Sequence, residues 1–197
     1  YATITDDNSP QLNGIKLNAV DGGIDKDILF QKGQYVYIAN VKHDTHAVKL
    51  DLDKNEGTTV TAYNEEGNPV DYSEGLPITK DMQTYTLKAT NGSAEVVYRL
   101  RLHRCQKDET YYNEKWRGQF HYSIKDGWAN DPNGMVYFKG EWHLFHQYYD
   151  GDKWGPMHWM HATSKDGIHW EEHPIAFYPD EYGTMYSGCA VIANHET

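Results

Sequence analysis

The stretch YTLKATNGSAEVVYRLRL, residues 85–102, indicates more about the fold than any other part of the sequence. Apolar and polar side chains alternate on both sides of Asn91-Gly92, and a period of two residues is typical of a β-strand with one buried face. Asn-Gly tolerates the positive φ angles of a tight hairpin turn. We therefore expect two antiparallel strands that meet at this dipeptide.

The same alternation continues toward the N-terminus. Val48, Leu50 and Leu52 alternate with charged residues, and turn-forming runs such as residues 65–69 interrupt the pattern. No stretch keeps the 3.6-residue period of an amphipathic helix for more than a few residues. Short strands of this kind predict an antiparallel β-sandwich domain over residues 1–104.

The end of this region, residues 85–100, resembles the cadherin-like or immunoglobulin-like sandwiches appended to secreted bacterial carbohydrate enzymes. It contains no aromatic triplet or acidic cluster that would indicate a sugar or calcium site. We therefore interpret it as a spacer or stabilising module, with glycan binding as the alternative.

After a polar linker at residues 105–115, the composition changes, and five of the six tryptophans lie between Trp128 and Trp170. Strands are expected at 134–139, 141–148, 156–164 and 168–172. Four consecutive antiparallel strands make one propeller blade, and residues 116–197 suffice for about two blades of about 40–45 residues. The predicted fold class is therefore all-β, a sandwich followed by the first blades of a truncated β-propeller.

The net charge of −11 argues against a nucleic-acid or anionic-membrane partner, and no apolar run approaches the ~20 residues of a membrane span. Cys105 and Cys189 lie in different predicted domains. We interpret both as free and partly buried, although a disulfide remains possible.

The eleven histidines include two pairs with a spacing of three, His143/His146 and His158/His161. Residues three apart in a strand point to opposite faces, so neither pair can converge on one ion. We expect no metal site and no cofactor.

The run WANDPNG, residues 128–134, places Asp131 between Asn130 and Pro132, just before a strand-like segment. Proline pushes the preceding residue away from helical geometry, so this carboxylate is expected at the mouth of a strand, in what could be an ordinary Asx-type turn. Four further blocks follow in order: EWHLFHQYY (141–149), WGPMHWMHATS (154–164), DGIHWE (166–171) and MYSGCAV (185–191). As a set, they resemble glycoside hydrolase family 32, the invertases, inulinases and levanases that cleave β-linked fructose.

The resemblance implies a five-bladed propeller and a retaining hydrolase in which Asp131 is the nucleophile. Such an enzyme pairs its nucleophile with an acid/base carboxyl roughly 5 Å away. The same resemblance implies that fructan or sucrose is bound by Trp128, Asn130, Gln147, Trp154, Tyr186 and Ser187. The remaining tryptophans of the predicted blade, Trp142, Trp159 and Trp170, are interpreted as packing residues.

Two departures from the family pattern bear on function. Tyr186-Ser187-Gly188-Cys189 stands where members usually carry Phe-Ser-Gly-Ser, and the family's Arg-Asp-Pro and Glu-Cys motifs do not occur. Because Glu-Cys carries the acid/base, we expect an N-terminal piece of a secreted or cell-surface enzyme. It would be inactive alone and would need the remaining blades, from the same parent chain or a second fragment. The alternatives are a fructosyltransferase of the same family, a non-catalytic fructan-binding or adhesive protein and, ranked low, an arabinan-cleaving propeller.

Overall fold

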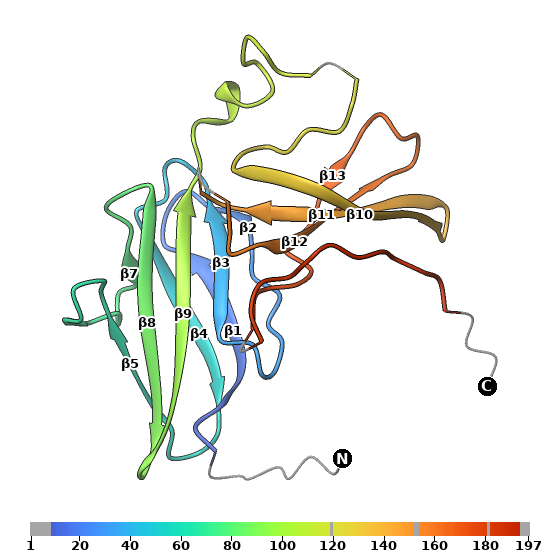
Figure 1. Ribbon diagram of the computed structural model, residues 1–197. Helices are drawn as coiled ribbons and strands as arrows, with labels where there is room; N and C mark the ends of the chain where they lie inside the picture. Colours follow the sequence, from blue (N-terminus) through green and yellow to red (C-terminus); the bar gives the residue numbers. More distant parts are fainter. Residues whose placement is uncertain (1–8, 119, 152–153, 181, 194–197) are drawn as a thin grey trace. The chain divides into compact units, whose positions relative to one another are not determined.

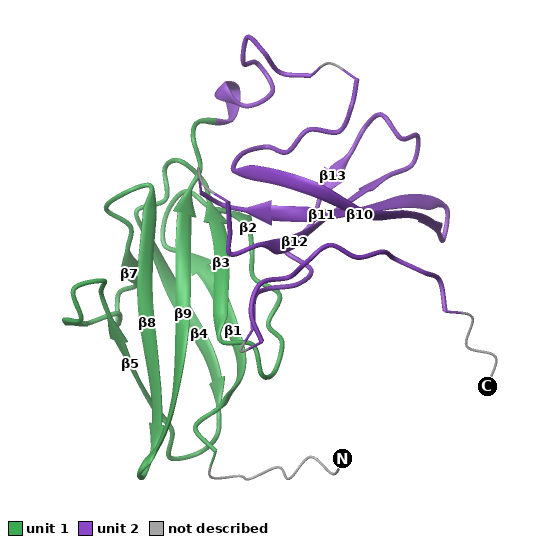
Figure 2. Cartoon of the chain, viewed as in Figure 1, with its two compact units in different colours: residues 1–107 green, residues 108–197 purple. Residues whose placement is uncertain are grey.

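The structure is a computed structural model that describes residues 9–118, 120–151, 154–180 and 182–193. The chain divides into two compact units, residues 1–107 and 108–197 (Figure 2). Among the described residues every regular element is a β-strand, apart from a single 3₁₀ turn, η1 (Asp108–Thr110). This confirms the predicted all-β fold class.

Unit 1 consists of two sheets that lie in two layers (Figure 1). The smaller sheet has the order β1 (Leu12–Ala19), β4 (Ala47–Lys54) and β7 (Leu76–Pro77). The larger sheet has the order β2 (Ile24–Lys26), β3 (Val36–Val41), β9 (Ala94–Arg104), β8 (Met82–Asn91), β5 (Thr59–Tyr63) and β6 (Pro69–Val70).

The hairpin expected at Asn91-Gly92 is confirmed, since β8 and β9 pair antiparallel from Met82↔His103 to Asn91↔Ala94. Their alternate apolar side chains are buried, as the pattern predicts: Tyr85, Leu87, Ala89, Tyr98, Leu100 and Leu102. Two buried phenols connect the sheets. Tyr98 Oη accepts a hydrogen bond from the Leu12 amide at 2.8 Å, and Tyr85 Oη donates to the Pro77 carbonyl at 2.5 Å. Each bond satisfies a polar group that burial would otherwise leave unpaired.

One strand pair differs from the antiparallel prediction. β3 runs parallel to β9, from Val36↔Arg99 to Val41↔Arg104. The alternation of side chains reports which face of a strand is buried and carries no information on the direction of its neighbour. The antiparallel prediction was therefore wrong for this pair.

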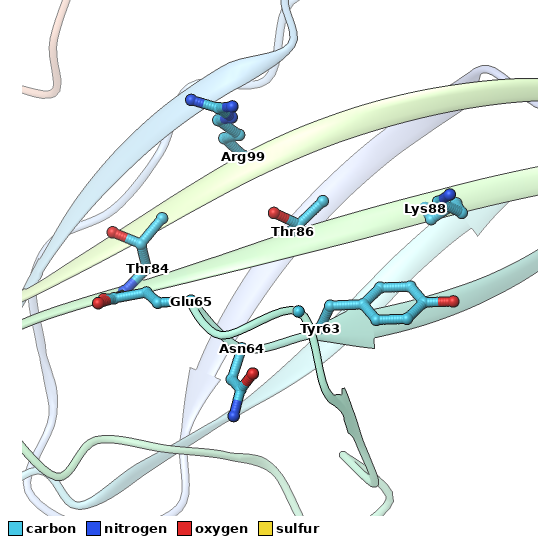
Figure 3. Close-up of a pocket in the computed structure, with 8 residues that line it drawn as sticks. Tyr63, Asn64, Glu65, Thr84, Thr86, Lys88 and Arg99 are labelled. Atoms are coloured by element: carbon cyan, nitrogen blue, oxygen red, sulfur yellow. Dashed lines mark hydrogen bonds between the residues drawn. The ribbon is translucent and has the colours of Figure 1, made fainter.

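A polar groove of about 590 Å³ lies on the larger sheet of unit 1 (Figure 3). Its lining contains one aromatic ring, that of Tyr63, and Lys88 Nζ lies 5.8 Å from the centroid of that ring. Glu65 at its edge accepts hydrogen bonds from Lys80 Nζ at 2.5 Å and from the Thr84 amide at 2.9 Å. Glycan binding by this unit remains a hypothesis.

Unit 2 contains one four-stranded antiparallel sheet, in the order β10 (Trp128–Phe138), β11 (Glu141–Tyr149), β12 (His158–Ser164) and β13 (Glu171–Glu172). The spatial order follows the chain, which is the arrangement of one propeller blade. β10 begins at Trp128 rather than near 134, and β13 is shorter than the expected 168–172. Asp166 Oδ1 accepts hydrogen bonds from the amides of Ile168 at 2.9 Å and His169 at 2.8 Å, which keeps this segment in a turn.

The described residues after β13 form no further sheet, only isolated bridges such as Trp159↔Phe177. Within the described residues neither cysteine forms a disulfide, and Cys105 is buried. Cys189 is exposed, so the expectation of partial burial was wrong for this residue. The described segment around it, residues 185–193, has no regular secondary structure.

Candidate functional site

Asp131 lies inside β10, at a place where the strand is distorted twice. The pairing runs Ala129↔Tyr148, Pro132↔His146 and Met135↔Leu144, so β10 has an extra residue on each side of Pro132. Such β-bulges bend a strand and redirect its side chains. The motif is therefore part of the strand, so Asp131 lies inside β10 and not at the mouth of a strand as predicted.

A segment that is distant in the sequence packs against the second bulge. Gly134 has φ +86°, and a Cβ built on it would lie 2.6 Å from the Ala190 amide nitrogen. Next to it, the fully buried Asn133 accepts a hydrogen bond from the Gly188 amide through Oδ1 at 3.3 Å. Only glycine combines this φ with so close an approach. Together these contacts bring residues 187–190 against β10.

The carboxylate of Asp131 is held from both sides. Asn130 Nδ2 donates to Oδ1 at 3.1 Å, and Ser187 Oγ donates to Oδ2 at 2.6 Å. Both distances lie within the range of protein hydrogen bonds, and the O–H···O contact is the shorter of the two. Asp131 itself remains exposed, so a ligand can reach it.

Ser187 is in turn oriented by Gln147 on β11. The Gln147 side chain is 3 % exposed, and its Nε2 donates to Ser187 Oγ at 3.0 Å and to the Met185 carbonyl at 3.2 Å. The Ser187 hydroxyl thus accepts a hydrogen bond from the Gln147 amide and donates one to Asp131. Four side chains singled out from the sequence, those of Asn130, Asp131, Gln147 and Ser187, form one hydrogen-bonded chain, which we call the Asp131 chain.

The three aromatic residues singled out with them are not part of this chain. Trp128 is 38 %, Trp154 53 % and Tyr186 73 % exposed. Trp128 starts β10 opposite Tyr149, and the carbonyl of Tyr186 accepts from Trp159 Nε1 at 3.0 Å. Within the described part of unit 2, none of the three rings is hydrogen-bonded to the Asp131 chain. Their exposed faces are available to a ligand.

A second network, which the sequence did not reveal, lies at β11 and β13. Tyr122 Oη is 3.0 Å from His146 Nε2 and donates to Glu172 Oε1 at 3.2 Å. Glu172 Oε1 also accepts from the Lys125 amide at 3.0 Å. Burial, and then the negative charge of Glu172, raise the pKa of Tyr122, so the phenol keeps its proton. No sequence pattern connects these residues, and Asn133, read only as a turn residue, was missed as well.

Histidines from adjacent strands meet on one face of the sheet. His143 Nδ1 lies 3.0 Å from His161 Nε2, and the His173 ring centroid is 4.9 Å from that of His161. Burial, followed by the charges of His173 and His143, lowers the pKa of His161 to about 4. Among the residues that the structure describes, no three His, Cys, Asp or Glu side chains are grouped so as to hold a metal ion.

Comparison with known proteins identified a protein family whose model matches the C-terminal part of the chain. Residues 121–197 match the family model described as "Glycosyl hydrolases family 32 N-terminal domain". The whole chain is 44 % identical to a fructan beta-fructosidase of Streptococcus mutans, of which it spans 14 %. A Bacillus subtilis levanase is 55 % identical over 46 % of this chain, which corresponds to 13 % of the levanase.

Among solved structures, the exo-inulinase of Aspergillus awamori is 49 % identical over 34 % of this chain and 13 % of its own, with a TM-score of 0.33. The chain thus spans only about a seventh of the first curated relative that it matches. In the described residues, no helix is both long and apolar enough to cross a membrane.

Proposed function

We propose that the parent protein is a retaining β-fructosidase with Asp131 as the nucleophile, because residues 121–197 match the model of the N-terminal domain of glycoside hydrolase family 32. The observation that carries this proposal is the Asp131 chain. An exposed carboxylate receives one hydrogen bond on each oxygen, from Asn130 and from Ser187. These donors orient the carboxylate, whose oxygen is the nucleophile in the proposed attack on carbon.

In the proposed reaction, an oxygen of Asp131 attacks the anomeric carbon of a β-linked fructosyl unit. The glycosidic bond breaks, and a general acid protonates the leaving oxygen while a covalent fructosyl-enzyme forms. The same group, now a base, then activates a water molecule that releases fructose. The motif that carries this acid/base in the family, Glu-Cys, does not occur in the sequence. We therefore assign the acid/base to a part of the parent protein outside these 197 residues.

The proposed substrates are sucrose and fructans such as levan and inulin. Relatives carry the names fructan beta-fructosidase, levanase and sucrose-6-phosphate hydrolase. Trp128 and Trp154 would cover the sugar with their ring faces and help to exclude water, while Gln147, Ser187 and Tyr186 would bind its hydroxyls. The Tyr186 hydroxyl adds a polar group at the rim of the site.

We also propose that the parent protein acts outside the cell or on its surface. An Aspergillus niger relative that is 46 % identical over 44 % of this chain is named an extracellular exo-inulinase. Polymeric fructans are too large to enter a cell unaided, which agrees with this location.

The decisive experiment is Asp131→Asn in the full-length parent protein. A neutral amide cannot form the covalent intermediate, so turnover of sucrose, inulin and levan should fall to background while the protein stays folded. Glu171→Gln is the matched control, because it makes the same carboxylate-to-amide change at an exposed position on β13. Wild-type turnover in Asp131→Asn would refute the assignment.

Product analysis separates hydrolysis from fructosyl transfer. A hydrolase releases free fructose even at high sucrose concentration, whereas a transferase lengthens the acceptor sugar. A protein that binds fructans but shows no turnover in its full-length form would instead be the non-catalytic alternative.

A further inference from the structure

His146 lies on β11, opposite the residue that follows the candidate nucleophile on β10. Its side chain is 3 % exposed, and its pairing partner on β10 is Pro132, the residue between the two bulges. The next residue, Gln147, holds Ser187 and thereby the Asp131 carboxylate. His146 is thus next to both features that fix Asp131. It pairs with Pro132 on the bulged strand β10, and it precedes Gln147 of the hydrogen-bonded side chains.

Both ring nitrogens of His146 have partners. Nδ1 lies 2.9 Å from the Gln147 carbonyl, which can only accept, so Nδ1 carries a hydrogen. Nε2 lies 3.0 Å from Tyr122 Oη, and Tyr122 is bonded to Glu172 at 3.2 Å. A buried polar ring needs such partners, because burial removes the hydrogen bonds that its nitrogens would otherwise make to water.

Tyr122 and Glu172 are themselves anchored. The Tyr122 ring packs edge-on against Trp170, with centroids 5.5 Å apart, and Glu172 accepts the Lys125 amide at 3.0 Å. Glu172 pairs with Ala162 on β12, so the support for His146 comes from across the sheet.

We propose that His146 is a positioning residue for Asp131, held in place by Tyr122 and Glu172. This inference rests on the proposed function and adds a residue to that site. His146 takes no part in bond making. It keeps Pro132 and the Gln147 peptide in register, so that the carboxylate between the bulges and the Ser187 hydroxyl stay aligned.

Three variants of the full-length protein test the inference: Tyr122→Phe, His146→Leu and His146→Gln. Because a displacement of 1 Å at a reacting group can cost about 10²-fold, we expect the first two to lower kcat by about tenfold with little change in KM. The side-chain amide of His146→Gln offers both a donor and an acceptor, so it can bond to Tyr122 Oη while that hydroxyl donates to Glu172, and this variant should recover most of the lost kcat. Tyr122→Phe combined with His146→Leu should cost no more than the larger single effect, since the two act through each other.

Tyr72→Phe is the matched control. It also removes a hydrogen-bonded tyrosine hydroxyl, here one that donates to the Val60 carbonyl at 2.9 Å within unit 1. Its kcat should equal that of the wild type. Thermal unfolding is followed for every variant, because a purely structural role would lower Tm and leave kcat unchanged.

The inference is overturned if Tyr122→Phe and His146→Leu keep the wild-type kcat, or if His146→Gln is as slow as His146→Leu. Asp131→Asn, measured alongside, separates the two proposals. If it abolishes turnover while the His146 variants do not affect kcat, only the positioning role fails. If Asp131→Asn is active, the proposed function fails.

Discussion

Gly134→Ala tests the contact that brings residues 187–190 to the nucleophile. Gly134 has φ +86°, and an added Cβ would lie 2.6 Å from the Ala190 nitrogen and 3.2 Å from Cys189 Cα. Both neighbours are backbone atoms, which cannot move aside by changing a rotamer. The substitution should push the 187–190 segment away and stretch the hydrogen bond between Ser187 and Asp131.

The expected cost has two parts. A non-glycine residue in a left-handed conformation costs roughly 1–2 kcal/mol, and overpacking adds typically about 1–3 kcal/mol. Gly134→Ala should therefore lower the free energy of unfolding of unit 2 by about 2–5 kcal/mol. Gly140→Ala is the control, because Gly140 has φ +92° but nothing within 4 Å of the built Cβ. It should lose only the backbone part, about 1–2 kcal/mol.

Urea unfolding of the 197-residue chain, followed by tryptophan fluorescence, measures this difference. All six tryptophans lie in residues 108–197, so the signal reports unit 2 and leaves unit 1 silent. Variants are compared through the shift in midpoint at a common m value. Equal losses for Gly134→Ala and Gly140→Ala would show that the 187–190 segment does not press on Gly134, and the geometry of the site would have to be revised.

Further predictions concern titration, the chain between the units and the isolated chain. The pKa of His161 is lowered to about 4 from 6.5, so between these two pH values the unfolded state binds a proton that the folded state does not. Stability should therefore fall progressively as the pH drops from about 6.5 to about 4, and a His161→Phe variant should lack that loss in a pH series of urea midpoints. Limited proteolysis should cut between Cys105 and Lys115 and leave a folded N-terminal piece, whereas cutting mainly within 85–104 would contradict the proposed boundary. The chain alone should release no fructose from sucrose or fructans and should self-associate, because its sequence contains no Glu-Cys motif and its four-stranded sheet has open edges. An active monomer on size-exclusion chromatography would refute this.

Local patterns in the sequence were sufficient for the strands of the hairpin and of the blade. The alternation in residues 85–102 predicted both the buried faces and the turn at Asn91-Gly92, because neighbours two residues apart share a face in any strand. The motif blocks after residue 128 likewise indicated the family whose model matches residues 121–197. Both conclusions depend only on residues that lie close together along the chain.

The arrangement of the site required the tertiary structure. Ser187 and Asp131 are 56 residues apart, and Glu172 and Tyr122 are 50 apart. Whether such residues meet depends on strand register, on the two bulges around Pro132 and on how the chain closes upon itself, none of which has a local signature. The same holds for the parallel pairing of β3 with β9. The sequence by itself determined which faces are buried and which chemical groups are present, and the tertiary structure decided which of those groups lie within hydrogen-bonding distance of Asp131.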